Sequence, residues 1–421
     1  MNFLYDFLIR CYALFLHLAA LFHPKARLWV SGRRNWRARY RAGWQKKGRV
    51  LWIHAASLGE FEQGRPVLES FRMQFPAWQV VLTFYSPSGY EIRKNYPHAD
   101  FIGYLPLDTR RNARDFLDLV QPDAALFVKY EFWANFLFEL KQRNTPTLLI
   151  SALFRPGQPF FRPYGVFWRR MLACFSHIFV QDEPSAALLR KTGFRNTTVA
   201  GDTRVDRVLK IAENAPQNGI TEAFAAGRPL VIAGSTWEAD ERIIAAALEQ
   251  LRDVKMVIAP HEPSERQLSR LIQHLKRPCI RYSRYNTTPG DEQATVLLID
   301  NIGLLNTLYR YGRVAYIGGG FGKGIHNTLE PAAFGLPILF GPNFEKFEEA
   351  RQFVARGGAF PVRNAAELAA RMVQFGDPEF YRKASAAVLT YLEENRGATE
   401  RILQYMAEQK DWLPEERYFS G

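Results

Sequence analysis

Apolar residues recur along the chain in short continuous runs, separated by stretches of helix length. The first set of runs covers residues 50–56, 80–85, 101–105, 124–128, 147–152 and 177–180, and the second covers 229–234, 256–259, 295–299, 314–318 and 337–340. Continuous apolar runs between helices are typical of strands buried on both faces of a parallel sheet. The pattern therefore predicts an α/β protein with two βα-repeating domains.

Polar, turn-forming residues near 206–228 separate the two sets of runs. We expect a membrane-associated segment over 1–48, a first domain over 49–205 and a second over 206–380. The helical pattern of 381–421 could return to the first domain. Ligands of open α/β sheets bind beyond the carboxyl ends of the strands, so we expect the substrates in a cleft between the domains.

The first 22 residues are mostly apolar but include Asp6, Arg10 and His17. Their cleanest apolar run is about a dozen residues, whereas a membrane span needs about 20. Residues 24–48 are rich in Lys and Arg, contain no acid, and interleave Trp29, Trp36, Tyr40 and Trp44 at helical spacing. We expect this segment to dock on an anionic membrane surface. A spanning helix, or a solvated charge run beside a buried first helix, are the alternatives.

The 421 residues carry a net charge of +13, which favours a partner rich in negative charge. Cys11, Cys174 and Cys279 lie far apart and form no metal-binding or CxxC spacing. This usage fits a reducing cytoplasm.

In the first domain, polar residues follow the predicted strands. Glu60 comes after the turn that ends the first run, Lys129 and Glu131 follow the fourth, and Arg155 and Arg162 lie in the aromatic-rich loop after the fifth. Lys129 and Glu131 would face the same way if their strand continued, and guanidinium groups suit phosphate. A helix-start Glu, a buried Lys–Glu pair and an ordinary surface loop are the structural alternatives.

In the second domain, three strand ends carry comparable residues. Ser235 and Thr236 follow the first run and His261 follows the next, while the loop after the fourth run holds Gly319, Gly320 and Lys323, then Asn327 and Glu330. A Gly-rich loop before a helix can cradle an anion, or can simply allow close packing. The loop matches neither a Walker A sequence nor the dinucleotide fingerprint.

Taken in order, these stretches resemble the 3-deoxy-D-manno-octulosonic acid (Kdo) transferases of lipid A biosynthesis. The WIHAxSxGE block of that family is matched by residues 52–60, YLPxD by 104–108, ExExWPN by 129–135 and GST by 234–236. The PRH block corresponds to 259–261, DxxGEL to 300–305, and GGHNxLEPAxFGxPxxFGP to 324–342. The chain departs from these blocks at Lys129, Ala134, Pro260, Leu304 and Ile325.

The resemblance implies a GT-B glycosyltransferase, with two Rossmann-like domains and an interdomain cleft. It implies an inverting enzyme that moves Kdo from CMP-Kdo to a lipid A precursor (lipid IVA) at the cytoplasmic face of the bacterial inner membrane. Glu60 would be the general base, and Lys129, Glu131, Arg155 and Arg162 would bind the acceptor. Donor contacts would come from Ser235, Thr236, His261, Asn301, Gly303, Gly319, Gly320, Lys323, Asn327 and Glu330.

The resemblance implies no metal, no cofactor and no nucleic-acid partner. Arg204 and Lys323 are candidate cations for the leaving phosphate. Two other functions stay open: a UDP-sugar-dependent transferase or epimerase of the same fold, and a degenerate, non-catalytic membrane scaffold. The number of Kdo residues transferred, the acyl pattern of the acceptor and the oligomeric state do not follow from the sequence.

Overall fold

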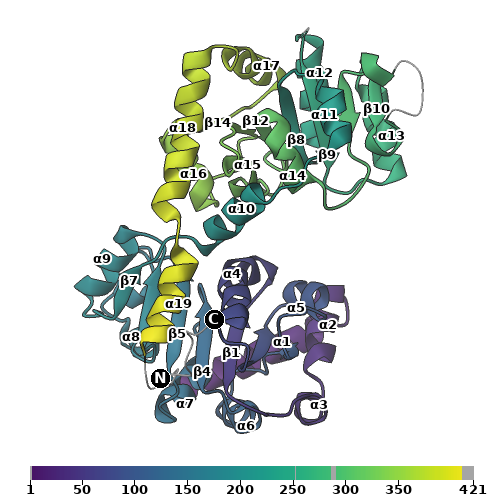
Figure 1. Cartoon of the computed structure of the whole chain (residues 1–421). Coiled ribbons are helices and arrows are strands. Elements are labelled where there is room, and N and C mark those ends of the chain that lie inside the picture. Colours follow the sequence, from purple (N-terminus) through teal and green to yellow (C-terminus); the bar gives the residue numbers. More distant parts are fainter. Residues whose placement is uncertain (1, 252, 286–290, 410–421) are drawn as a thin grey trace. The chain divides into compact units, whose positions relative to one another are not determined.

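A computed structural model describes residues 2–251, 253–285 and 291–409. The chain divides into two compact units: Met1–Asp206 with Asn395–Gly421, and Arg207–Glu394. Each unit is built on a parallel sheet flanked by helices (Figure 1). Helix α19 therefore belongs with the first unit, although 188 residues of the second unit precede it in the chain.

Within the described residues, the sheet of unit 1 has seven strands in the order β3-β2-β1-β4-β5-β6-β7. The strands are β1 (Val50–Ala55), β2 (Gln79–Phe84), β3 (Phe101–Tyr104), β4 (Ala124–Val128), β5 (Thr147–Ala152), β6 (His177–Val180) and β7 (Thr197–Val199). The helices are α1 (Asn2–Ala19), α2 (Pro24–Arg33), α3 (Trp36–Gly43), α4 (Leu58–Gln74), α5 (Pro87–Arg93), α6 (Arg110–Val120), α7 (Ala134–Gln142), the 3-10 helix η1 (Pro159–Phe161), α8 (Val166–Leu172), α9 (Glu183–Lys191), α10 (Thr203–Glu213, which runs into unit 2) and α19 (Ala398–Glu408).

The described part of unit 2 also has a seven-stranded sheet, in the order β10-β11-β9-β8-β12-β13-β14. The strands are β8 (Leu230–Thr236), β9 (Lys255–Pro260), β10 (Cys279–Arg281), β11 (Val296–Leu298), β12 (Gly312–Ile317), β13 (Ile338–Phe340) and β14 (Ala359–Pro361). The helices are α11 (Gly219–Ala225), α12 (Glu238–Glu249), α13 (Glu265–His274), η2 (Tyr282–Arg284), η3 (Asp291–Gln293), α14 (Leu305–Leu308), η4 (Tyr309–Tyr311), α15 (Leu329–Ala332), α16 (Glu348–Ala355), α17 (Ala365–Gln374) and α18 (Pro378–Asn395).

The two parallel sheets confirm the predicted α/β class. All eleven predicted runs contain a strand, and the strands that the pattern missed are β7, β10 and β14. Each of these has three residues and lies at the edge of a sheet. An edge strand is covered less completely than a central one, so its sequence lacks a long apolar run.

Strand β1 shows why the central runs are continuously apolar. Val50 and Trp52 pack against α3, α6 and α7 on one face of the sheet, and Leu51 and Ile53 pack against α4 and α19 on the other. Helices α4 and α19 lie side by side (Figure 1). Alternate side chains of a strand point to opposite faces, so burial on both faces requires an apolar residue at every position.

The basic segment is organised differently from the expected single helix. Helices α2 and α3 are separated at Asn35, whose φ is 53°, and Trp29, Trp36, Tyr40 and Trp44 are buried in unit 1. These four aromatic residues complete the core of unit 1, so they do not form one side of a single helix, as their helical spacing indicated. The exposed apolar surface belongs to α1 instead, where Phe3, Phe7, Leu14, Phe15 and Leu18 are all more than half exposed.

No described helix has the length and apolar character needed to cross a membrane.

Candidate functional site

Each sheet reverses its strand order next to its first strand, between β1 and β4 in unit 1 and between β8 and β12 in unit 2. Loops leave the carboxyl edge on opposite sides of such a point, and the crevice between them is where open α/β sheets bind ligands. The sequence-predicted site residues Glu60, Glu131 and Gly319 follow β1, β4 and β12, and Ser235 lies among the last residues of β8.

Glu60 lies in the first turn of α4, three residues after Ser57, the N-cap of this helix. The side chain is half-buried, and its Oε2 accepts a hydrogen bond from Ser57 Oγ. A carboxylate in a first helical turn is stabilised by the helix dipole. Its partner Ser57 orients one oxygen, and this leaves Glu60 suited to accept a proton from a substrate hydroxyl.

Glu131 and Lys129 would face the same way only if β4 continued through them, and it does not. Strand β4 ends at Val128, and Lys129 takes a left-handed conformation with a φ of 67°. The turn directs Glu131 inward, where it is only 6% exposed. Burial alone would raise the pKa of Asp202, but Arg204 and, to a smaller extent, Lys129 lower it below the usual value.

The carboxylate of Glu131 belongs to a buried polar network that the sequence analysis missed. Glu131 Oε2 lies 3.0 Å from His54 Nε2 and accepts a 2.6 Å hydrogen bond from Trp133 Nε1. On the other side of the imidazole, His54 Nδ1 lies 2.8 Å from Thr83 Oγ1, which accepts a hydrogen bond from Trp52 Nε1. Strands β1, β2 and β4 thus hold one oxygen of Glu131 in place.

Three loops of unit 1 contribute charge around Tyr130, which lies on a fourth. Burial raises the pKa of Tyr130; Arg155 opposes this shift, and Asp182 and Glu60 add to it. These residues follow β4, β5, β6 and β1, which are neighbours in the sheet. The fold thus brings Glu60 and Arg155 into one electrostatic environment at the carboxyl edge.

The aromatic-rich loop after β5 is less available to a ligand than its composition indicated. Phe160 and Phe167 are buried in the core, and Arg169 donates hydrogen bonds to the carbonyl oxygens of Phe160 and Arg162. The side chains of Arg155 and Arg162 are exposed. Arg204 is committed to Asp202, which its guanidinium contacts through Nε and, at 2.6 Å, through Nη2.

In unit 2, three aromatic rings gather at the switch point. His261 follows β9, Trp237 follows β8, and His326 lies in the loop after β12. The rings of His261 and His326 stack with centroids 4.4 Å apart, and His261 lies 4.6 Å from the ring of Trp237. Trp237 Nε1 donates a 2.9 Å hydrogen bond to His326 Nε2. Burial, with a smaller contribution from His261, lowers the pKa of His326 to about 4.

The Gly-rich loop is held by a buried carboxylate. Asp240 accepts hydrogen bonds from the backbone N–H groups of Gly319 and Trp237 and from the hydroxyl of Tyr316. Gly319 has a φ of 93°, and a Cβ on Gly320 would lie 2.5 Å from the backbone nitrogen of Gly341. Close backbone packing therefore requires these glycines, whether or not the loop also binds an anion.

The other predicted donor residues differ in accessibility. Thr236 is fully buried, and its hydroxyl donates to Glu241, so it faces the interior. Ser235 is partly exposed and has a φ of 54°, a strained conformation for a non-glycine residue. Lys323 is exposed, and Asn327 is exposed with its amide bonded to Glu330 at 3.0 Å.

Asn301 and Gly303 lie on the exposed loop after β11, two strands from β8. This loop leads into α14, whose Leu305 packs near Gly234: a Cβ on Gly234 would approach Leu305 to 2.9 Å and the Tyr309 hydroxyl to 2.4 Å. No three or more His, Cys, Asp or Glu side chains of the described chain are grouped to hold a metal ion.

Sequence reasoning missed His54, Trp237 and His326 as members of these networks. His54 is the third residue of the WIHAxSxGE block and Trp237 directly follows GST, so both were adjacent to residues already chosen. Neither motif shows that the side chains meet residues from other strands.

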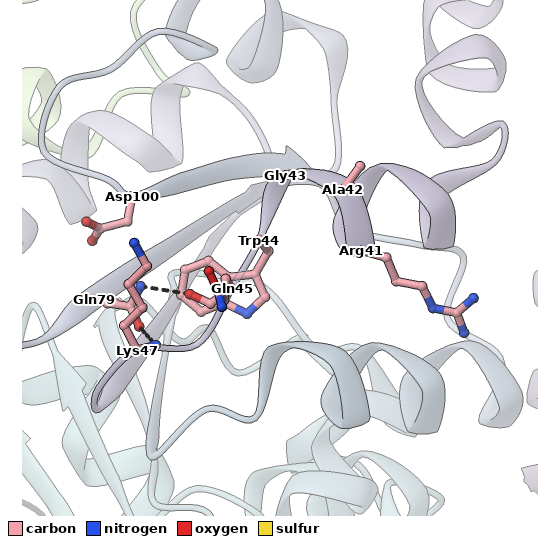
Figure 2. Close-up of a pocket in the computed structure, with 8 residues that line it drawn as sticks. All are labelled: Arg41, Ala42, Gly43, Trp44, Gln45, Lys47, Gln79 and Asp100. Atoms are coloured by element: carbon pink, nitrogen blue, oxygen red, sulfur yellow. Dashed lines mark hydrogen bonds between the residues drawn. The ribbon is translucent and has the colours of Figure 1, made fainter.

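A separate cavity of about 740 Å³ lies at the opposite, amino edge of the unit 1 sheet. Figure 2 shows Lys47 and Asp100 near each other there, with Gln79 hydrogen-bonded to the backbone of Lys47 and of Gln45. Asp100 is already paired with Arg72 at 2.9 Å. Its place at the amino edge separates this cavity from the residues described above.

Comparison with known proteins supports the motif-based interpretation. The family model described as 3-deoxy-D-manno-octulosonic-acid transferase (kdotransferase) matches residues 34–207. A 3-deoxy-D-manno-octulosonic acid transferase of Haemophilus influenzae is 26% identical, over 85% of this chain and 86% of the relative. The enzyme of the same name from Bordetella pertussis is 27% identical, over 86% and 87%.

Among solved structures, the UDP-GlcNAc 2-epimerase of Neisseria meningitidis has a TM-score of 0.58 at 18% identity, covering 86% of this chain and 100% of that one. At this identity the likeness shows the two-sheet fold alone. The family model, the two relatives and the ordered motifs together confirm that this chain is similar to the 3-deoxy-D-manno-octulosonic acid transferases over most of its length.

Proposed function

We propose that this chain is an inverting glycosyltransferase that moves Kdo from CMP-Kdo to a phosphorylated lipid A precursor. The observation that carries the proposal is the position of Glu60, which is held by Ser57 at the switch point of a sheet whose sequence matches the Kdo transferase family model. The names of the relatives support Kdo as the transferred sugar. The CMP donor and the lipid acceptor rest on the family resemblance.

In the proposed reaction, Glu60 takes the proton of the attacking acceptor hydroxyl. The acceptor oxygen forms a bond to the anomeric carbon of Kdo as the bond from that carbon to the phosphate oxygen of CMP breaks. The bonding electrons leave with CMP, and attack from the opposite side inverts the anomeric configuration. Ser57 is the positioning residue, because its hydroxyl already orients the carboxylate of Glu60.

Unit 2 is proposed to bind the donor at its switch point. His326 is neutral near pH 7, because its pKa is lowered to about 4. Its Nε2 accepts from Trp237, so Nδ1 carries the proton and can donate to an anionic oxygen. The exposed Lys323 in the same loop supplies positive charge. Together they would stabilise the charge that develops on the leaving CMP.

The membrane surface is proposed as the place where the acceptor is met, at the cytoplasmic face of the inner membrane. Support comes from the exposed apolar side chains of α1, including Phe3 at 83% and Phe22, just after the helix, at 88%. A contiguous apolar surface of this kind marks an interaction site on a protein. The cations of residues 24–48 would add attraction to anionic lipid.

A transfer assay tests the proposal. The chain is incubated with CMP-Kdo and a tetra-acylated, phosphorylated disaccharide lipid, and the products are identified by mass. The expected product is the acceptor plus Kdo. Glu60→Gln should abolish transfer while preserving CMP binding, and Glu62→Gln is the matched control, because Glu62 lies in the same helix but pairs with Arg93 at 2.6 Å. Full activity of Glu60→Gln would refute the assignment of the base.

A nucleotide comparison separates the alternatives. CMP should raise the thermal unfolding midpoint of the chain more than UDP does. A preference for UDP would favour a UDP-sugar enzyme of the same fold, and no response to either nucleotide, together with no transfer, would favour a scaffold.

A further inference from the structure

Arg33, the last residue of α2, is enclosed by aromatic rings. Its guanidinium carbon lies 4.0 Å from the ring centroid of Trp29, 4.5 Å from that of Tyr85 and 5.1 Å from that of Tyr104. The guanidinium donates to the backbone oxygen of Tyr85 at 2.8 Å and to that of Trp29 at 3.3 Å. Cation–π contacts and carbonyl dipoles hold the group in a fixed position.

Arg33 forms no ion pair with a carboxylate in the described part of the chain. Its Nε is buried and lacks a hydrogen-bond partner. The same is true of Nε1 of Trp29, a residue only 5% exposed. Burial lowers the pKa of Arg33 to about 10. A desolvated cation and two unused donors are costly unless an anion completes them.

A cavity of about 440 Å³ adjoins these groups, between α1, α2 and the amino end of α6. Ala13, Val30 and Leu107 form apolar walls, Arg34 adds a second cation, and His17 and Asn112 are the other polar residues; none of the described residues that line the cavity is a carboxylate. Leu107 follows β3 and the Tyr85 carbonyl follows β2, so this cavity lies at the same carboxyl edge of the sheet as Glu60.

We propose that this cavity binds the phosphate of an anionic membrane lipid, with an acyl chain lying along α1. Arg33 and Arg34 bind the phosphate, since guanidinium groups donate paired hydrogen bonds to phosphate oxygens. The apolar walls contact the glycerol and the first methylenes of the acyl chain.

The exposed side chains of α1 distinguish a lipid from a free phosphate ion as the occupant. Ala13 and His17 line the cavity, and the neighbouring Leu14, Leu18 and Leu21 are each more than half exposed. A free phosphate would leave these side chains uncovered, whereas an acyl chain leaving the cavity would cover them. The inference deepens the proposed membrane association and rests on that part of the proposed function. Its test measures lipid binding, so it can fail while sugar transfer succeeds.

The test uses the full chain and a soluble probe, monomeric dihexanoyl phosphatidylglycerol, with binding followed by native mass spectrometry and calorimetry. We expect one lipid per chain. Arg34→Gln should weaken binding at least tenfold, and Val30→Phe should do the same by filling the cavity while keeping every charge. Arg33→Lys keeps the charge but loses the planar donor set, and should weaken binding similarly.

Arg41→Gln is the matched control, because Arg41 is an exposed cation of the same basic segment that lies outside this cavity. Its lipid affinity should stay within about twofold of the parent. Equal loss in the control and the cavity variants would overturn the proposal, as would unchanged binding in Val30→Phe and Arg34→Gln. Displacement of the lipid by an equimolar amount of inorganic phosphate would show a free-phosphate site, and would also overturn it.

Discussion

The indole Nε1 of Trp237 donates a hydrogen bond to Nε2 of His326 over 2.9 Å, and both rings stack with His261 between strand ends β8, β9 and β12. The hydrogen bond selects the tautomer of His326 that carries its proton on Nδ1. A donor–acceptor pair of this kind contributes about 1 kcal/mol, equivalent to roughly a fivefold change in an equilibrium constant.

Trp237→Phe preserves an aromatic ring for the stack but removes the donor. We expect His326 to populate both tautomers, and CMP affinity to fall by about fivefold. Imidazole ¹⁵N chemical shifts report the tautomer, and calorimetry reports the affinity. A single unchanged tautomer in the variant would show that Trp237 does not select it.

His326 should titrate near pH 4, because burial and the neighbouring His261 lower its pKa. Its folded pKa lies below the unfolded value of about 6.5, so the stability that it contributes is present above that value and is lost as the pH falls through 4. An NMR titration measures the midpoint. His261→Ala should raise the pKa of His326 by removing its repulsion, and a midpoint near 6.5 in the parent chain would contradict the burial seen here.

His54→Phe should destabilise unit 1 by about 1–3 kcal/mol, because Glu131 would lose a buried hydrogen-bond partner at 3.0 Å. Glu131→Gln in the His54→Phe background should recover part of this loss, since a neutral amide needs less compensation than a carboxylate. Chemical denaturation of the single and double variants measures both effects. Additive losses would show that the two side chains do not interact.

Burial raises the pKa of Asp108 to about 7, although its carboxylate accepts from the Tyr5 hydroxyl and from two backbone N–H groups at the start of α7. A raised carboxyl pKa contributes stability that is fully present below the unfolded value of about 4 and is lost as the pH rises through 7. The unfolding free energy should therefore fall between pH 4 and 7, by up to about 1.4 kcal/mol per pH unit from this group. Asp108→Asn should flatten this part of the profile, and an unchanged slope would contradict the assignment.

Substitution of the exposed apolar face of α1 should weaken sedimentation with anionic vesicles. The triple variant Phe7→Ser, Leu14→Ser, Leu18→Ser tests this more cleanly than deletion of residues 1–22. Deletion would also remove Tyr5 and Asp6, which hydrogen-bond to Asp108 and Asn135. Val373→Ser is the control, because Val373 is exposed in unit 2. Equal sedimentation of the triple variant and the control would show that α1 is not the membrane contact.

The sequence by itself determined the α/β class, the central strands and the order of the motifs. These depend on local patterns: a strand buried on both faces needs an apolar residue at each position, and a strand end needs a turn. The short edge strands β7, β10 and β14 lacked such a pattern, because each has three residues and most of these are only partly buried.

Only the tertiary structure decided which side chains meet. The turn at Lys129 directs Glu131 onto His54, 77 residues away in the chain, and the strand order brings Trp237 to His326 across 89 residues. It also placed Trp29 and Trp36 in the core, left the apolar side chains of α1 exposed, and put Arg33 beside an open cavity with no carboxylate partner among the described residues. Spacing along a chain reports a neighbour only within one helix or strand, whereas a site at the edge of a sheet is assembled from the ends of several strands.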